Sequence, residues 1–150
     1  MCVIVDASVA GLVFSIPYQV DFAPLWRWLI EKDGKLVYGG QLAKELGRLP
    51  KAKRILAELK SEGRALLCPR QKVDEEEKEV HKLGLCRSDD PHVIALARVS
   101  GARVLCTNDG DLEVDFKNRQ LVPAPRGTIY KNASHKSLLK HNRTCIGRLR

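Results

Sequence analysis

Two short apolar runs, each followed closely by acidic residues, constrain the fold most strongly. Residues 2–5 (CVIV) run directly into Asp6, and residues 103–106 (RVLC) lead into a turn over residues 107–111 (TNDGD). Such short runs, without strict alternation of apolar and polar positions, are typical of strands buried on both faces of a parallel sheet. We therefore expect two buried strands with acidic residues at their carboxyl ends.

Helical periodicity occupies much of the chain between these strands. Ser8, Asp21 and the segment 88–91 (SDDP) are helix-start signals. The predicted helices cover residues 9–14, 22–30, 42–49, 51–62, 72–83 and 91–100, and further short strands are predicted at 36–38, 66–68 and 121–122. Strands that alternate with helices indicate an α/β fold with a central, mostly parallel sheet and right-handed crossovers.

The positive charge of the chain is concentrated at its C-terminal end. The 150 residues carry 26 Lys+Arg and 18 Asp+Glu, a net charge of +8, and residues 126–150 hold seven of the basic residues and no acid. This distribution predicts a nearly neutral domain over 1–125 and a basic C-terminal extension over 126–150. Because clustered basic side chains attract phosphates, the extension is predicted to bind RNA. The candidate contacts are Arg126, Lys131, Lys136, Lys140 and Arg143.

The sequence carries no signal for a membrane or for secretion. No apolar run approaches the roughly 20 residues that span a bilayer, and the first residues (MCVIVD) lack the cationic start of a signal peptide. The five cysteines are scattered and form no CxxC pair, which is typical of reduced thiols. We therefore expect a cytoplasmic protein without a membrane partner.

Four acidic residues are candidates for a common site. Ligands of open parallel sheets bind beyond the carboxyl ends of the strands, where Asp6 and Asp109 are expected. Asp90 begins the helix before the second strand, and Glu45 lies beside apolar positions of the helix over 42–49. Converging carboxylates need a cation, and oxygen ligands favour Mg²⁺ or Mn²⁺. Taken singly, each acid also has an ordinary explanation as a helix cap, a turn residue or a solvent-facing helix residue.

Four sequence motifs resemble those of the PIN-domain family of metal-dependent ribonucleases, which includes the VapC-type toxins. Residues 3–9 (VIVDASV) are similar to the family's opening hhhDxS/N pattern, and residues 41–46 (QLAKEL) resemble the helix that bears its glutamate. Residues 90–97 (DPHVIALA) resemble the segment that begins with the third acid, and 104–112 (VLCTNDGDL) the strand that ends in TxDxD[FL]. The resemblance covers about residues 2–122 and implies a PIN-like α/β/α sandwich.

The resemblance also implies which residues form the site. The implied catalytic residues are Asp6, Glu45, Asp90 and Asp109. Of these, Asp6, Asp90 and Asp109 would bind Mg²⁺ or Mn²⁺ directly, with Glu45 as a ligand or a positioner of water. The implied supporting residues are Ser8, Thr107, Asn108 and Asp111. Asp89 precedes Asp90 directly, and the motif spacing favours Asp90 as the acid that points inward.

On this resemblance the chain is expected to be an Mg²⁺- or Mn²⁺-dependent endoribonuclease that hydrolyses RNA phosphodiester bonds. The resemblance is also compatible with the toxin of a toxin–antitoxin pair, which would bind an antitoxin protein, and with a homodimer. Two alternatives are a non-catalytic RNA-binding or ribosome-associated module and a DNA nuclease of related fold. Metal-dependent cleavage of defined RNA and DNA substrates separates these alternatives.

Overall fold

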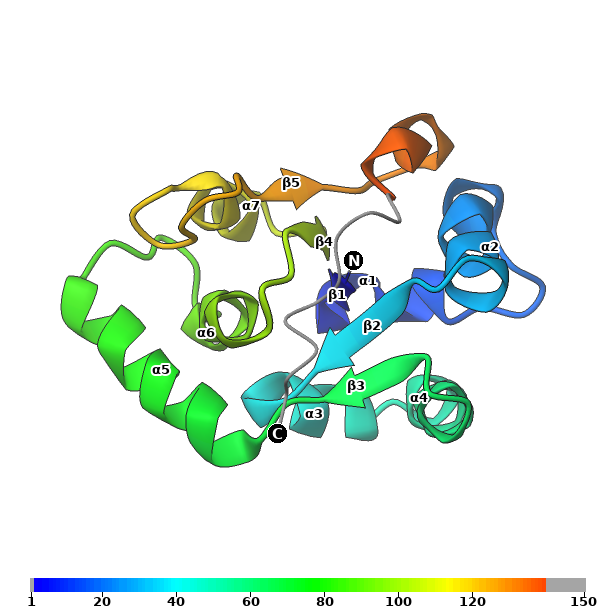
Figure 1. Cartoon of the computed structure of the whole chain (residues 1–150), viewed down its shortest axis with the longest axis horizontal. Coiled ribbons are helices and arrows are strands. Elements are labelled where there is room, and N and C mark those ends of the chain that lie inside the picture. The colour runs from blue at the N-terminus through cyan, green and yellow to red at the C-terminus, as the bar shows by residue number, and fades with distance from the viewer. Residues whose placement is uncertain (1, 140–150) are drawn as a thin grey trace.

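A five-stranded, all-parallel sheet forms the centre of the computed structural model, which describes residues 2–139 (Figure 1). The strands are β1 (Cys2–Val5), β2 (Lys35–Tyr38), β3 (Ala65–Leu67), β4 (Val104–Cys106) and β5 (Thr128–Ile129). Their order across the sheet is β3-β2-β1-β4-β5. The predicted α/β class with a parallel sheet is therefore confirmed.

The two strands predicted from their apolar runs are neighbours in the sheet. Strand β1 pairs with β4 so that Val5 lies opposite Cys106, and the amide of Asp6 donates to the carbonyl of Cys106 at 2.9 Å. The chain moves from β1 to β2 and β3 on one side, and returns to β4 and β5 on the other. The carboxyl ends of β1 and β4 thus flank the point where the strand order reverses, which is where open α/β sheets bind ligands.

Helices lie on both sides of this sheet, with α5 and α6 on the left of Figure 1 and α2 and α4 on the right. This layering is consistent with a sandwich. The α-helices are α1 (Ala7–Val13), α2 (Ala23–Glu31), α3 (Gly40–Gly47), α4 (Pro50–Ser61), α5 (Arg70–Leu83), α6 (Pro91–Ser100) and α7 (Gly110–Lys117). Two short 3₁₀ helices, η1 (Val20–Phe22) and η2 (Ala133–Leu138), lie against α2.

Local sequence signals explain where several helices begin and end. Proline occupies the first turn of α2, α4 and α6, where its missing N–H costs nothing and its fixed φ suits the helix. Gly84 and Gly101 follow α5 and α6 with φ of 64° and 79°, the left-handed conformation that ends many helices. The predicted stop at Gly101 is confirmed.

The hydrophobic core surrounds α6 and the two central strands. Residues 93–97 of α6 (VIALA) are all buried, as are residues 3–5 of β1. A helix that is apolar on nearly all sides needs cover, and α5 packs along α6 with the buried Val73 and Val80. Each fully buried Val, Leu or Ile contributes about 1.5–3 kcal/mol relative to an exposed one. This core holds the start of α6 beside the carboxyl ends of the central strands.

The C-terminal part of the sheet differs from the sequence-based expectation. Residues 121–122 are buried but form no strand, because the amides of Leu121 and Val122 both donate to the carbonyl of Asn118 in a turn. The edge strand is β5 instead, followed by the buried Tyr130, whose hydroxyl donates to the Asp21 carbonyl at 2.7 Å. The boundary predicted at residue 125 therefore falls within the sheet-forming body.

Helix α7 lies where the sequence patterns predict no helix. Leu112, Val114 and Phe116 alternate with charged residues, a spacing of two that is typical of a strand. The helix forms because Asp109 caps its first amides, while Leu112 and Phe116, four residues apart, share the buried face.

The cysteines test the expectation that the thiols are reduced. Cys68, Cys86 and Cys106 are free thiols, whereas Cys2 is disulfide-bonded, so the expectation of reduced cysteines is wrong for Cys2. Burial raises the pKa of Cys68 to about 11 and that of Cys106 to about 12, which keeps both thiols protonated and unreactive at neutral pH.

Within residues 2–139, no helix has the length and apolar character needed to cross a membrane.

The close packing of Gly127, just before β5, leads to a prediction about stability. A Cβ added at Gly127 would overlap the carbonyl oxygen of Phe116 and lie 2.7 Å from its ring carbon Cδ2, so Gly127→Ala must displace β5 or α7. We expect Gly127→Ala to lower the free energy of unfolding by about 1–3 kcal/mol. In α1, by contrast, a Cβ at Gly11 meets no atom within 4 Å, so Gly11→Ala should stabilise the protein by about 0.5–1 kcal/mol. Chemical denaturation of both variants measures the difference, and equal stability would contradict the close packing of β5 on α7.

Candidate metal centre

The carboxylate of Asp6 lies at the end of β1 and is held by two hydroxyl groups. The Asp6 side chain is buried, and its Oδ2 accepts hydrogen bonds from Ser8 Oγ at 2.7 Å and Thr107 Oγ1 at 2.8 Å. Asp6 precedes α1 but makes no side-chain cap, so helix capping does not account for it. Within residues 2–139, Oδ1 of Asp6 accepts no hydrogen bond and is available to a ligand.

Ser8 and Thr107 also connect the ends of the two central strands. The Ser8 and Thr107 hydroxyls lie 3.4 Å apart, and the amide of Asn108 donates to Ser8 Oγ at 3.1 Å. The amide of Asp109 donates to Thr107 Oγ1, also at 3.1 Å. The predicted supporting residues Ser8, Thr107 and Asn108 are therefore brought together, although Asn108 contributes its backbone and its side chain is exposed.

Asp109 serves as a helix cap with one of its oxygens. Its Oδ1 accepts from the amides of Asp111 at 2.9 Å and Leu112 at 3.2 Å, which caps α7. These bonds orient the carboxylate and leave Oδ2 without a hydrogen bond in the part of the chain that the structure describes. The Asp111 side chain is exposed, so this predicted supporting residue contributes only its amide to the capping turn.

A buried acid that the motifs do not indicate holds the loop before Asp90. The carboxylate of Asp115 is 1% exposed and accepts hydrogen bonds from the amides of Arg87 and Ser88 at 2.9–3.1 Å. Ser88 Oγ in turn accepts from the amide of Asp90 at 3.3 Å. The available signal was the i, i+3, i+4 spacing of Leu112, Asp115 and Phe116, which places the acid on the apolar face of a helix. Helix α7 therefore positions both Asp109 and the Asp90 loop.

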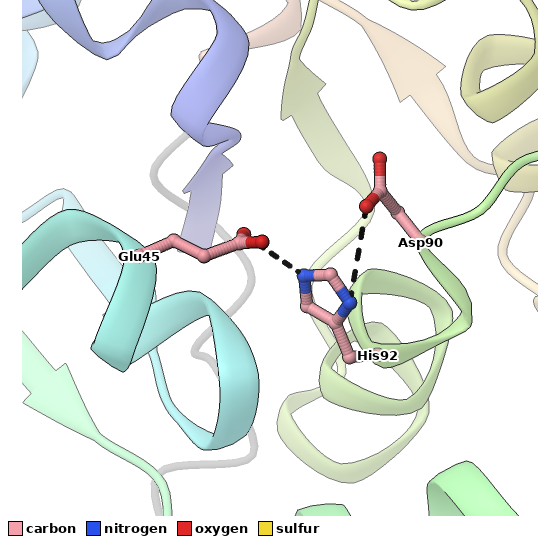
Figure 2. Close-up of side chains that lie close together, drawn as sticks. All are labelled: Glu45, Asp90 and His92. Carbon is pink, nitrogen blue, oxygen red and sulfur yellow. Dashed lines mark hydrogen bonds and ion pairs between the residues drawn. The ribbon is translucent and has the colours of Figure 1, made fainter.

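Asp90 and Glu45 approach each other across the imidazole of His92 (Figure 2). His92 Nε2 lies 3.2 Å from Glu45 Oε1, and His92 Nδ1 lies 4.0 Å from Asp90 Oδ1. The His92 side chain is only 5% exposed, against 28% for Glu45 and 26% for Asp90. Ligand atoms of these three residues lie within 4.8 Å of one another, a spacing compatible with a metal ion. Sequence reasoning missed His92, although a polar residue in the first turn of the mostly apolar helix α6 was a signal.

The charges of the other three predicted acids all reach Asp90, although Asp6 and Asp109 lie outside the group of ligand atoms within 4.8 Å of one another that Glu45, Asp90 and His92 form. Burial raises the pKa of Asp90, and the charge of Asp6 raises it further. Glu45 and Asp109 act in the same direction, and His92 partly opposes them. Within residues 2–139, no Lys or Arg forms an ion pair with any of the four acids. Among the described residues, His92 and the hydrogen bonds to Asp6 and Asp109 offset part of this negative charge. The neighbouring Asp89 lines the same groove, but its side chain is exposed.

A groove of about 610 Å³ extends from Glu45, Asp90 and His92 along α3 and α5. Its lining also includes the basic residues Lys44, Arg70 and His81, together with Asp74 and Glu77. Lys44 and Arg70 are shared with an adjoining hollow of about 380 Å³ that has a mainly apolar lining. The acidic cluster is thus open to a ligand from one side, and basic side chains lie along the approach.

The predicted RNA contacts of the C-terminal segment are scattered. Arg126 and Lys136 are exposed, whereas Lys131 Nζ is paired with Glu113 Oε1 at 2.6 Å. Lys140 and Arg143 lie outside the described residues.

The raised pKa of Asp90 generates a prediction about stability without metal. Because the folded protein binds the Asp90 proton more tightly than the unfolded chain, stability is greatest below the unfolded pKa and is lost as the pH rises through the folded pKa. At neutral pH without divalent cations, Asp90→Asn removes this cost, and we expect the Tm to rise by about 2 °C. Asp89→Asn removes the same charge from an exposed position and should leave the Tm nearly unchanged. Thermal denaturation in a chelator measures both variants, and a lower Tm for Asp90→Asn would contradict the repulsion.

Comparison with known proteins adds no family to this geometry. No protein-family model matches the chain, and neither a curated protein nor a solved structure matches it. The PIN resemblance therefore rests on the four sequence motifs, and the antitoxin partner and the homodimer stay predictions. The arrangement of Asp6, Glu45, Asp90 and Asp109 is the main observation from which a function can be argued.

Proposed function

We propose that the protein is an Mg²⁺- or Mn²⁺-dependent endoribonuclease whose active site is the cluster of Asp6, Glu45, Asp90 and Asp109. The observation that carries the proposal is that the charges of Asp6, Glu45 and Asp109 all reach the partly buried Asp90 near the strand-order reversal, without a compensating Lys or Arg ion pair in the described part of the chain. Clustered carboxylates without a neighbouring base lower the stability of the folded protein. Proteins retain them where they bind a cation or take part in a reaction. The order of the four PIN-like motifs supports the same function.

The residues present fit a hard divalent cation. Asp6 and Asp109 each keep one carboxylate oxygen free of hydrogen bonds within residues 2–139, and Asp90 is partly buried beside them. Carboxylate oxygens are the ligands that Mg²⁺ and Mn²⁺ prefer. Asp6, Asp90 and Asp109 would hold the ion, and the bound ion would stabilise charge on the attacked phosphate and lower the pKa of water.

The protein's own contribution is to hold the acids in place before the substrate arrives. Ser8 and Thr107 fix the orientation of Asp6 through its Oδ2, and the first amides of α7 fix Asp109 through its Oδ1. Asp115 holds the loop that carries Asp90. Such partners keep ligands in a reactive geometry, and their loss commonly costs 10–100-fold in metal affinity or activity.

The charge distribution supports an anionic polymer as the substrate. The net charge of +8 favours nucleic acid, and Lys44 lines the groove beside the acids, where Arg70 pairs with Asp74 at 3.4 Å. Exposed Arg126 and Lys136 add positive charge. RNA rather than DNA follows from the PIN resemblance, and a substrate panel distinguishes the two.

Cleavage of labelled single-stranded RNA and DNA with Mn²⁺, Mg²⁺ or chelator tests the proposal. We expect metal-dependent RNA cleavage, lowered at least about 100-fold by Asp90→Asn, because loss of a direct ligand should cost no less than loss of its supporting partner. Asp89→Asn is the matched control and should retain activity. RNA binding without cleavage would replace the proposal with a non-catalytic RNA-binding module, and equal activity of Asp90→Asn would contradict the assigned site.

A further inference from the structure

The imidazole of His92 carries an inference about how the metal is bound. The ring lies between two carboxylates, with Nε2 3.2 Å from Glu45 Oε1 (Figure 2). A carboxylate oxygen can only accept a hydrogen bond, so Nε2 must carry the proton and donate it to Glu45. The charged ring that opposes the acids carries a proton on Nδ1 as well, and a metal ion that binds there takes the place of that proton. In the neutral ring that a metal can bind, Nδ1 has a lone pair and no proton. Glu45 thus selects the tautomer of His92.

The lone pair of Nδ1 has no hydrogen-bond partner in the described part of the chain. The nearest oxygen of Asp90 lies 4.0 Å away, beyond hydrogen-bond distance, and it is also an acceptor. The His92 side chain is only 5% exposed and lines the groove beside Asp90, so a ligand can reach this nitrogen from the groove. His92 Nδ1 and Asp90 Oδ1 can each offer a lone pair, and two such atoms 4.0 Å apart are typical of ligands that share one metal ion. A cation with bonds of about 2.1 Å to nitrogen and to oxygen can contact both atoms.

We propose that His92 Nδ1 is a metal ligand beside Asp90, and that Glu45 acts on His92 rather than on the metal. This inference rests on the proposed function only in that a divalent cation binds the acidic cluster. Metal-binding histidines commonly donate their second ring N–H to a carboxylate, which fixes the tautomer and raises the basicity of the ligand nitrogen. The Glu45–His92–Asp90 arrangement has this form.

A nitrogen ligand changes which metal the site prefers. Imidazole suits later first-row ions best, and Mn²⁺, the first of that series, accepts a nitrogen ligand more readily than Mg²⁺, which binds mainly oxygen and keeps several waters. The wild-type protein should therefore bind Mn²⁺ more tightly than Mg²⁺. His92→Gln should weaken Mn²⁺ binding by about 10-fold or more, and should change Mg²⁺ binding much less.

Pulsed electron paramagnetic resonance of the Mn²⁺-loaded, untagged protein tests the ligand directly. A Mn²⁺-bound imidazole produces nitrogen modulation of the echo, and selective ¹⁵N-histidine labelling of the wild-type protein identifies it without any substitution. We expect the modulation in wild type and in His81→Gln, and its loss in His92→Gln. His81 is the matched control, because it lines the same groove with a 63% exposed side chain.

The outcomes separate this inference from the proposed function. Bound Mn²⁺ without histidine modulation overturns the ligand role of His92, whether or not RNA is cleaved. Modulation that persists in His92→Gln also overturns it. Modulation that depends on His92 in a protein that cleaves no RNA supports the ligand role and contradicts the nuclease. A wild-type protein that binds no Mn²⁺ overturns the ligand role.

Discussion

The parallel pairing of β1 with β4 is the constraint on which the site depends. The pairing places Val5 opposite Cys106, so the residues that follow each strand emerge at the same edge of the sheet. Asp6 and the 107–111 turn are then neighbours, although about 100 residues separate them in the chain. A ligand can contact Asp6 and Asp109 together only because the two strands pair in this way. The Ser8 and Thr107 hydroxyls also connect the two strand ends.

The rest of the fold brings the other two acids to this edge against electrostatic repulsion. Helix α6 is anchored by its apolar residues, and α7 holds the preceding loop through the buried Asp115. Helix α3 contacts α6 and carries Glu45 toward His92. Packing and backbone hydrogen bonds therefore hold together negative charges that repel one another. Binding and catalytic sites commonly reduce the stability of the fold in this way. Asp90 bears part of this energetic cost, because burial and the neighbouring acids raise its pKa.

The sequence predicted the parts of the fold that local patterns determine. The buried runs at 2–5 and 104–106, the prolines at helix starts and the stop at Gly101 are such patterns, and the structure contains each of them. Strand β5 was not predictable in this way, because two residues carry no periodicity and its position follows from the packing of Gly127 on Phe116. Asp6, Asp90 and Asp109 were found because each begins a helix or follows a strand, and Glu45 because it lies beside apolar positions of a helix. The roles of His92 and Asp115 depend on contacts with Glu45 and the Asp90 loop, which only the tertiary structure provides.

The central claim is that Asp6, Asp90 and Asp109 form one metal-binding centre at the carboxyl ends of β1 and β4, with Glu45 beside it. Anomalous diffraction at the manganese absorption edge, from crystals grown with Mn²⁺, tests it most directly. The account predicts a peak in contact with Asp90 and with Asp6 or Asp109. A peak confined to another part of the molecule, or no peak at Mn²⁺ concentrations that saturate the protein in solution, would contradict the account.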